Sequence, residues 1–141
     1  MAKDTLRSVH IERTAVGQYS VRNVRGDSIS VGSDLEGSFT PVELLLAAIG
    51  CCTAIDVDVI TTRRAEPEQF TVTVTGDKIR DEAGNRMVNL AVGFTVTFPA
   101  GETGDAARAV LPQAVRTSHD RLCTVSRTVE LGTQVSISVT S

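Results

Sequence analysis

Apolar and polar residues alternate along residues 8–32, in short runs that turn-forming residues interrupt. An alternation with a period of two is typical of strands that bury one face of a sheet. Gly17 and the stretch Arg25-Gly26-Asp27 lie between the runs, where tight turns would be needed. The segment is therefore predicted to form a three-stranded antiparallel meander.

A long apolar segment begins at Pro41 and predicts a helix. Thr40 and Glu43 have the spacing of a capping box, and proline is favoured at the first helical position. The segment is apolar nearly all round, which predicts a buried central helix. Its length would also suit a membrane span, but Glu43, Asp56 and Asp58 would be costly in lipid. We therefore expect a soluble protein with no membrane association.

The rest of the chain predicts a hairpin, a second helix, a short helical turn and a last strand. These elements are expected at residues 70–75 and 88–98, 106–119, 124–129 and 134–140. The order βββ-α-ββ-α-(α)-β predicts an α+β fold with antiparallel sheets packed on a buried central helix. Because no repeat or linker is visible, residues 1–141 are expected to form a single domain.

The composition is that of an ordinary globular protein and narrows the choice of partners. The chain is 41% hydrophobic, 22% charged and 4% aromatic, with a formal net charge of −3. A weakly negative chain with few aromatic side chains is poorly suited to nucleic acid, so we expect no such partner. The chain has three cysteines and no apolar leader in its first residues, which predicts a reduced, cytoplasmic protein.

Cys52 and Cys123 are the candidates for redox chemistry. A stabilised thiolate can attack a peroxide bond, and a second thiol can trap the resulting sulfenic acid as a disulfide. Gly50 weakens the predicted helix just before Cys52, which indicates that another backbone or a ligand approaches it closely. Cys123 lies between Arg121 and Arg127 and at the start of the predicted helical turn, where a thiolate would be stabilised.

Two other interpretations stay open at this point. All three cysteines can be small buried apolar side chains, and Cys51 fits this best because it faces a different side of the helix from its neighbour. A zinc site would use His119, four residues before Cys123, with Cys51 or Cys52, although no CxxC pair is present. Asp56 lies four residues after Cys52 and would raise its pKa, so we expect Asp56 to pair elsewhere.

Two stretches resemble the cysteine motifs of the OsmC/Ohr family (osmotically inducible protein C-like and organic hydroperoxide resistance proteins). They are Thr40–Val57 (TPVELLLAAIGCCTAIDV) and Ser118–Arg127 (SHDRLCTVSR), and the element order matches as well. The resemblance implies an intertwined α+β homodimer that reduces hydroperoxides, with Cys52 as the peroxidatic and Cys123 as the resolving cysteine. It also implies a dithiol reductant, either of the lipoyl type or a cellular thiol, and no bound cofactor is expected.

The chain departs from the hydroperoxide-resistance members at one position. Those members carry a glutamate directly after the motif proline, which helps to hold an arginine over the thiolate. Here Val42 occupies that position and Glu43 follows, about 100° further around a helix. Arg13 is offset from the expected arginine, near which Ala15 falls, so Arg13 and Glu43 are the candidates for thiolate support. The chain thus resembles the less characterised OsmC-like branch, and a ligand-binding or redox-sensing module on the same fold is the alternative function.

Overall fold

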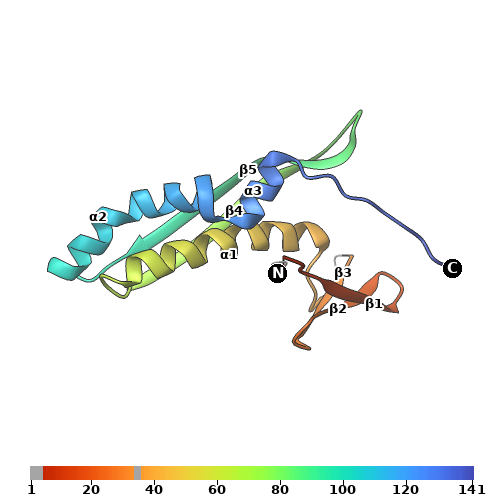
Figure 1. The fold of residues 1–141 in the computed structure, drawn as a ribbon, viewed down its shortest axis with the longest axis horizontal. Helices are drawn as coiled ribbons and strands as arrows, with labels where there is room; N and C mark the ends of the chain where they lie inside the picture. Colours follow the sequence, from red (N-terminus) through yellow and green to blue (C-terminus); the bar gives the residue numbers. More distant parts are fainter. Residues whose placement is uncertain (1–4, 34–35) are drawn as a thin grey trace. The chain divides into compact units, whose positions relative to one another are not determined.

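The computed structural model describes residues 5–33 and 36–141 of the chain. They form two compact units, Met1–Leu45 and Leu46–Ser141, and the organisation as a single domain stays a prediction. Within the described residues the fold is α+β, with two antiparallel sheets and three α-helices (Figure 1). This confirms the fold class expected from the sequence.

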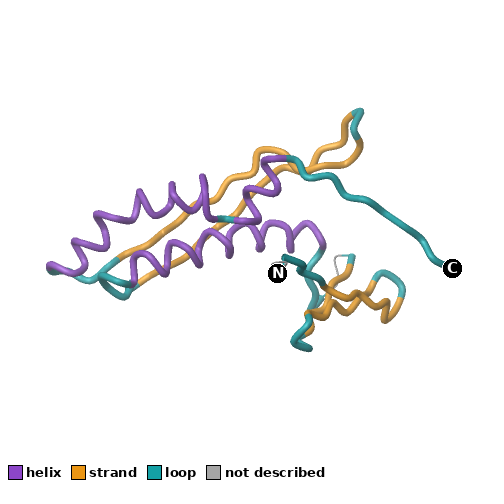
Figure 2. Tube along the Cα trace, in the orientation of Figure 1, coloured by secondary structure: helices purple, strands orange, loops and turns teal. Residues whose placement is uncertain are grey.

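The first unit contains the predicted meander. Its strands pair in the order β1 (Val9–Ala15), β2 (Gln18–Asn23) and β3 (Ser28–Gly32), all antiparallel. Gly17 and Gly26 occupy the two connecting turns with φ of 70° and 93°, a conformation that glycine adopts without steric cost. The turn residues recognised in the sequence therefore set the two reversals of the chain (Figure 2).

A long hairpin forms the sheet of the second unit. Strands β4 (Gln69–Asp81) and β5 (Gly84–Thr97) pair antiparallel, and Phe70 and Phe94 meet across them edge to face with ring centroids 6.1 Å apart. The hairpin is longer than predicted because the hydrogen-bonded ladder continues past a bulge between Thr75 and Asp77 into polar residues. Polar residues at a hairpin tip carry no hydrophobic alternation, so the sequence pattern did not reveal them.

Helix α1 spans Pro41–Thr62 and begins at the predicted capping box. The Thr40 amide donates to Glu43 Oε1 at 2.8 Å, and the Glu43 amide donates to Thr40 Oγ1 at 3.2 Å. Further along, a Cβ added to Gly50 would lie 2.5 Å from Val74 Cγ2 of β4. The glycine therefore allows α1 to approach the hairpin closely, and its close neighbour is a side chain of β4 where the sequence suggested another backbone or a ligand.

The burial of α1 differs from the prediction. By length and composition the helix could cross a membrane, yet it also packs on the hairpin as a core helix does. Its buried stripe consists of Ile49, Gly50, Thr53, Val57 and Thr61. A second stripe stays exposed and consists of Ala48, Cys51, Ile55 and Val59. The helix is thus buried on one side within the described chain, and the apolar residues on its other side are exposed to solvent.

Three further segments complete the second unit. Helix α2 (Glu102–Thr117) begins earlier than predicted, a π-helical turn η1 (Ser118–Leu122) follows it, and α3 (Thr124–Leu131) confirms the expected helical turn. The strand predicted at residues 134–140 does not form, and Val135, Ile137 and Val139 are 85–88% exposed. Its alternation is that of a strand, but a strand forms only where a sheet edge offers backbone partners.

A candidate redox-active thiol site

Cys52 and Cys123 meet in the second unit, although they are distant in the sequence. Cys52 lies on α1 and is partly exposed, whereas Cys123 lies between η1 and α3 and is 0% exposed. Each thiol influences the pKa of the other, so the two side chains lie near each other, and all three cysteines of the chain are free thiols. The structure therefore brings together the two sulfurs that the sequence singled out and leaves Cys51 exposed on another side of α1.

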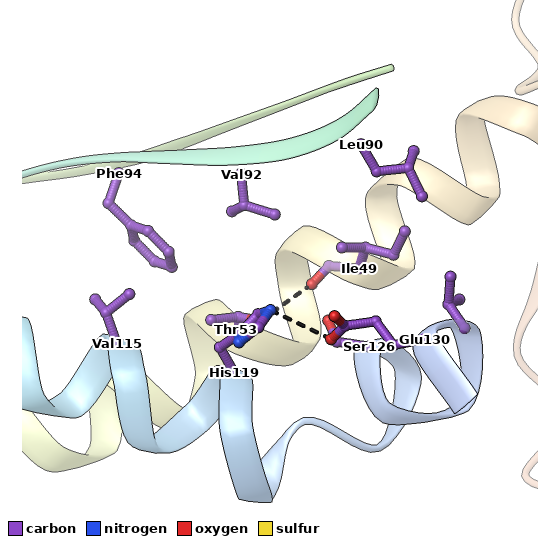
Figure 3. Close-up of a pocket in the computed structure, with 10 residues that line it drawn as sticks. Ile49, Thr53, Leu90, Val92, Phe94, Val115, His119, Ser126 and Glu130 are labelled. Atoms are coloured by element: carbon purple, nitrogen blue, oxygen red, sulfur yellow. Dashed lines mark hydrogen bonds and ion pairs between the residues drawn. The ribbon is translucent and has the colours of Figure 1, made fainter. Parts of the chain in front are cut away.

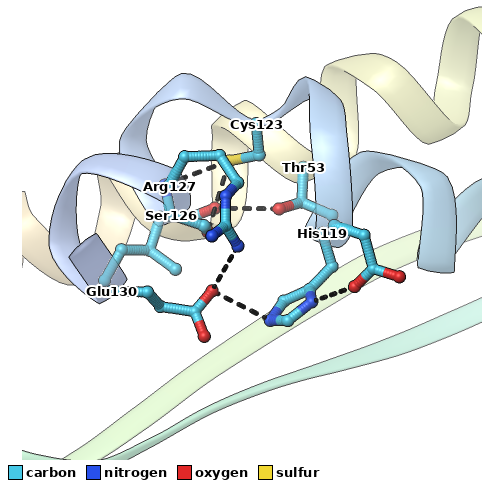
Figure 4. A network of polar contacts seen from close by, with 8 residues as sticks. Thr53, His119, Cys123, Ser126, Arg127 and Glu130 are labelled. Carbon is cyan, nitrogen blue, oxygen red and sulfur yellow. Dashed lines mark hydrogen bonds and ion pairs between the residues drawn. The ribbon is translucent and has the colours of Figure 1, made fainter.

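Hydrogen-bond donors surround the sulfur of Cys123. This residue is the N-cap of α3, and its Sγ accepts from the Ser126 amide at 3.4 Å and donates to Ser126 Oγ at 3.3 Å. The Thr53 hydroxyl of α1 lies in the same cluster (Figure 4), donates to the Ile49 carbonyl oxygen at 3.4 Å and contributes to the lowered pKa of Cys123. Burial alone would raise the pKa of the Cys123 thiol, but the hydrogen bonds from Ser126, Thr53 and Cys52 together lower it.

Cys52 has the opposite electrostatic environment. Burial raises the pKa of the Cys52 thiol most, and the neighbouring sulfur of Cys123 and the carboxylate of Asp56 raise it further. Among the groups that act on Cys52 within the described residues, the Val125 amide alone lowers the pKa of the thiol. The pKa of Cys123 is thus shifted down and that of Cys52 up, and the stabilising position of Cys123 at a helix start agrees with the sequence.

Asp56 accepts a hydrogen bond from a neighbour, as expected, but it still acts on Cys52. Ser118 Oγ donates to Asp56 Oδ2 at 2.7 Å, which links α1 to the start of η1. The carboxylate still contributes to the raised pKa of Cys52. One hydroxyl donor thus reduces the effect of this charge on the thiol without removing it.

A cavity of about 320 Å³ lies beside the thiol pair. Thr53 and Ser126 line it and also contact the sulfur of Cys123, so they separate the cavity from that sulfur. In Figure 3 side chains of β5 point toward it from one side and side chains of the helices from the other. Most of the remaining wall is apolar, formed by Ile49, Leu90, Val92, Phe94, Val115 and Val129.

The polar rim of the cavity is a chain of ion pairs. His119 Nδ1 lies 2.9 Å from Asp120 Oδ1, and its Nε2 lies 3.2 Å from Glu130 Oε1, which Arg127 also contacts at 3.3 Å. The hydrogen bond to the Asp120 carboxylate, together with the charge of Glu130, raises the pKa of His119. The zinc site considered from the sequence needed His119 and the cysteines as joint ligands, but both ring nitrogens of His119 face carboxylates instead.

Arg13 and Glu43, the proposed thiolate supports, both lie in the first unit. Arg13 is on β1 opposite Tyr19, and the carboxylate of Glu43 accepts from the Thr40 amide in the capping box. Arg127, one of the two arginines that flank Cys123 in the sequence, forms an ion pair with Glu130. Thiolate support by Arg13 or Glu43 therefore stays a prediction.

The sequence analysis missed Thr53 and Ser126, the two hydroxyl donors of the site. A weak signal existed for Ser126, because the N-cap side chain of a helix accepts from the backbone amide two or three residues later. Cys123 at that position places Ser126 next to the sulfur. No local signal pointed to Thr53, because its contact with Cys123 depends on how α1 and α3 pack.

Comparisons with known proteins agree with this architecture. The family model for OsmC-like protein matches residues 32–138. Uncharacterized proteins of Mycobacterium tuberculosis and Mycobacterium bovis are 31% identical over 131 residues, spanning 92% of this chain and 93% of theirs.

Two solved structures show the same fold. An OsmC-like protein of unknown function from Vibrio cholerae superposes with a TM-score of 0.74 at 15% identity, over 89% of this chain and 94% of that one. The organic hydroperoxide resistance protein OhrB of Bacillus subtilis superposes with a TM-score of 0.55 at 12% identity, over 89% and 92%. At these identities the similarity concerns the fold alone.

Proposed function

Because the chain belongs to the OsmC-like protein family, we propose that it reduces organic hydroperoxides through Cys52 and Cys123. The observation that carries the proposal is the pair of free thiols, near enough to influence each other's pKa, together with a largely apolar cavity lined by neighbouring residues. A partly exposed thiol near a buried thiol of lowered pKa has the arrangement that a two-cysteine peroxidase needs, because one sulfur must be reached and the other must be protected.

The proposed reaction has two steps. The Cys52 sulfur attacks the distal oxygen of the hydroperoxide, the O–O bond breaks, and Cys52 becomes a sulfenic acid while the alcohol leaves. The Cys123 thiolate then attacks the sulfenic sulfur, the S–O bond breaks, and water leaves after protonation of the hydroxide, which produces a disulfide. An external dithiol of the lipoyl type, or a cellular thiol, returns two electrons and restores both thiols.

The cavity supports an organic rather than an inorganic peroxide. Its volume of about 320 Å³ falls at the lower end of the usual size range of small-molecule sites, and its walls are mainly aliphatic and aromatic. Hydrogen peroxide would gain nothing from such walls, whereas the apolar body of an alkyl or aryl hydroperoxide would be desolvated there.

The test is a single-turnover reaction of the reduced protein with one equivalent of cumene hydroperoxide. We expect loss of two of the three thiols, a mass decrease of about two daltons for one disulfide, and a Cys52–Cys123 linkage in the peptide map. Consumption of excess hydroperoxide should then require a dithiol such as dihydrolipoamide. Unchanged thiols after the reaction would contradict the proposal.

A second candidate function is a redox-sensing or ligand-binding module on the same fold. It is favoured by one observation, since a backbone amide rather than a guanidinium is the group that lowers the pKa of Cys52 within the second unit. The same experiment separates the two candidates. A sensor forms the disulfide once but does not turn over with dithiol, whereas the peroxidase consumes many equivalents of hydroperoxide.

We further propose that the protein is a cytoplasmic homodimer. Cycling requires a compartment that reduces the disulfide again. The dimer is supported by the exposed stripe of α1 and by the exposed tail residues Val135, Ile137 and Val139, which alternate like a strand without a sheet edge to pair with. A second copy would cover the exposed stripe of α1 and would offer a sheet edge with which the tail could pair.

Deleting residues 133–141 should shift the protein from dimer to monomer, because the tail would lose its pairing with the second copy. Analytical ultracentrifugation over a range of concentrations measures the change, and Thr140→Ala, which keeps the alternating residues, serves as the control. An undiminished dimer after the deletion would show that the tail does not contribute to assembly.

A further inference from the structure

Cys123 has a structural role that its proposed redox role would disturb. It is the N-cap of α3, a helix of eight residues. Its Sγ accepts a hydrogen bond from the Ser126 amide at 3.4 Å and donates its own hydrogen to Ser126 Oγ at 3.3 Å. The second contact needs the S–H group, so it exists only while Cys123 is a thiol.

We propose that Cys123 is a redox-sensitive cap, whose entry into the disulfide with Cys52 uncaps α3 and loosens this helix from the cavity wall. The inference rests on the proposed hydroperoxide reduction and adds a conformational step to it. The disulfide forms as both thiols lose their hydrogens and two electrons pass to the hydroperoxide, and the dithiol reductant later returns them. The Cys123 sulfur then has no hydrogen for Ser126 Oγ, and its new bond to α1 draws it from the Ser126 amide.

Hydrogen bonds place the segment of Cys123 against the face of α1 that carries Cys52. Ser118 Oγ donates to Asp56 Oδ2 at 2.7 Å, and the Ser118 carbonyl oxygen accepts from the Cys123 amide at 2.8 Å. Asp56 lies four residues after Cys52, and residues at this spacing share one face of a helix. Ser118 thus ties the residue that caps α3 to the part of α1 from which the disulfide partner comes.

Helix α3 is short enough for one cap to matter. With eight residues it is below the length at which isolated helices are stable in water, so it depends on its caps and its packing. Glu130 of α3 pairs with His119 at 3.2 Å and with Arg127 at 3.3 Å. These ion pairs join partly exposed side chains and therefore stabilise the helix only weakly, whereas the Cys123 cap is buried.

Loosening of α3 changes the access to the site. Ser126, Val129 and Glu130 of this helix line the cavity. Cys123 itself is 0% exposed, so an external thiol cannot reach its sulfur while the wall is in place. A helix that yields after oxidation lets the alcohol leave and admits the reductant to the disulfide. Reduction restores the cap and closes the wall, so the two redox states differ in the order of one helix.

Hydrogen exchange followed by mass spectrometry tests the cap. In a Cys51→Ser background, the dithiol form is compared with protein oxidised by diamide, which makes disulfides without a hydroperoxide, and peptide mapping establishes that Cys52 and Cys123 are joined. Exchange in the peptide that covers α3 should become about fivefold faster in the oxidised form, the factor to which the usual free energy of an N-cap corresponds. The peptide that covers α2 should exchange equally in both forms.

Three variants separate the cap from general effects of oxidation. Cys52→Ser cannot form the disulfide, so diamide should leave the exchange of α3 unchanged. Cys123→Ala removes the cap without oxidation, and its α3 should exchange about as fast as in the oxidised protein while α2 stays protected. Cys123→Ser supplies a hydroxyl, which serinyl N-caps use in the same way, so its α3 should stay protected before and after diamide.

The outcomes distinguish the cap from the proposed function. Equal exchange of α3 in the dithiol and disulfide forms overturns the cap, even in a protein that reduces hydroperoxides. If diamide yields no disulfide between Cys52 and Cys123, the cap is overturned together with the proposed pairing. If the disulfide forms and α3 loosens, but cumene hydroperoxide is not consumed with dihydrolipoamide, the proposed function fails and the cap is supported. If Cys123→Ala is misfolded by circular dichroism, the comparison of the two redox forms decides.

Discussion

Replacing Cys52 by serine should abolish hydroperoxide reduction, with a loss of at least about a thousandfold, as expected when the nucleophile of a site is removed. A serine hydroxyl cannot form the sulfenic acid through which the oxygen is transferred. The structure leaves no substitute, because Cys123 is 0% exposed and hydrogen-bonded by Ser126, while Cys51 is exposed on another stripe of α1. The measurement is hydroperoxide consumption at saturating dithiol, with thermal unfolding to establish that the variant folds.

Cys51→Ser is the matched control, because it changes the adjacent cysteine of the same helix. Its activity should stay within about twofold of wild type, the effect typical of an exposed substitution away from a functional site. If Cys51→Ser is the inactive variant instead, the peroxidatic role belongs to Cys51. If both single variants keep full activity, neither thiol of α1 is the nucleophile.

Local sequence signals predicted those parts of the fold that depend on neighbouring residues. The glycines at positions 17 and 26, the capping box of Thr40 and Glu43, and the start of α3 at Cys123 were all visible in the chain. Each depends on a backbone conformation or a hydrogen bond within a few residues, which propensity and spacing report well. The order of elements, and with it the α+β class, followed from these signals.

Features that depend on tertiary contacts were predicted less well. Burial of α1 on all sides was expected from its apolar composition, but in this chain one stripe faces the hairpin and the other is uncovered. The tail from 134 to 140 was expected to be a strand, and its alternation was real, but pairing needs an edge that local sequence cannot supply. Both differences concern surfaces that a second copy would cover.

Prediction of the thiol site was also limited by contacts between elements that are distant in the sequence. The sequence identified both sulfurs and a stabilising helix start at Cys123, while the family motif assigns the peroxidatic role to Cys52. In the structure the donors gather around Cys123, and one of them, Thr53, comes from a different helix. The contribution of Thr53 to the pKa of Cys123 thus depends on packing between α1 and α3, which motif spacing does not encode.

Replacing Gly104 by alanine should have the largest effect on stability. Gly104 is a buried residue in the first turn of α2, and a Cβ there would collide with the carbonyl oxygen of Pro99. This carbonyl is held in place, because Arg108 Nη2 donates to the Pro99 oxygen at 3.3 Å and to the Phe98 oxygen at 3.2 Å. The clash should cost about 3 kcal/mol, offset by about 1 kcal/mol from the better helix propensity of alanine. We therefore expect Tm to fall by roughly 5–8 °C in calorimetry.

Thr103→Ala is the control for this prediction, because Thr103 precedes Gly104 in the same turn and its side chain is exposed. This substitution raises the helix propensity at position 103 and adds no atom near Pro99. The free energy of unfolding of the variant should therefore stay within about 0.5 kcal/mol of wild type or rise slightly. Equal melting temperatures for the two variants would mean that α2 does not begin against Pro99. The early start of α2 would then have to be ascribed to its acidic first turn, Glu102 and Asp105, acting on the helix dipole alone.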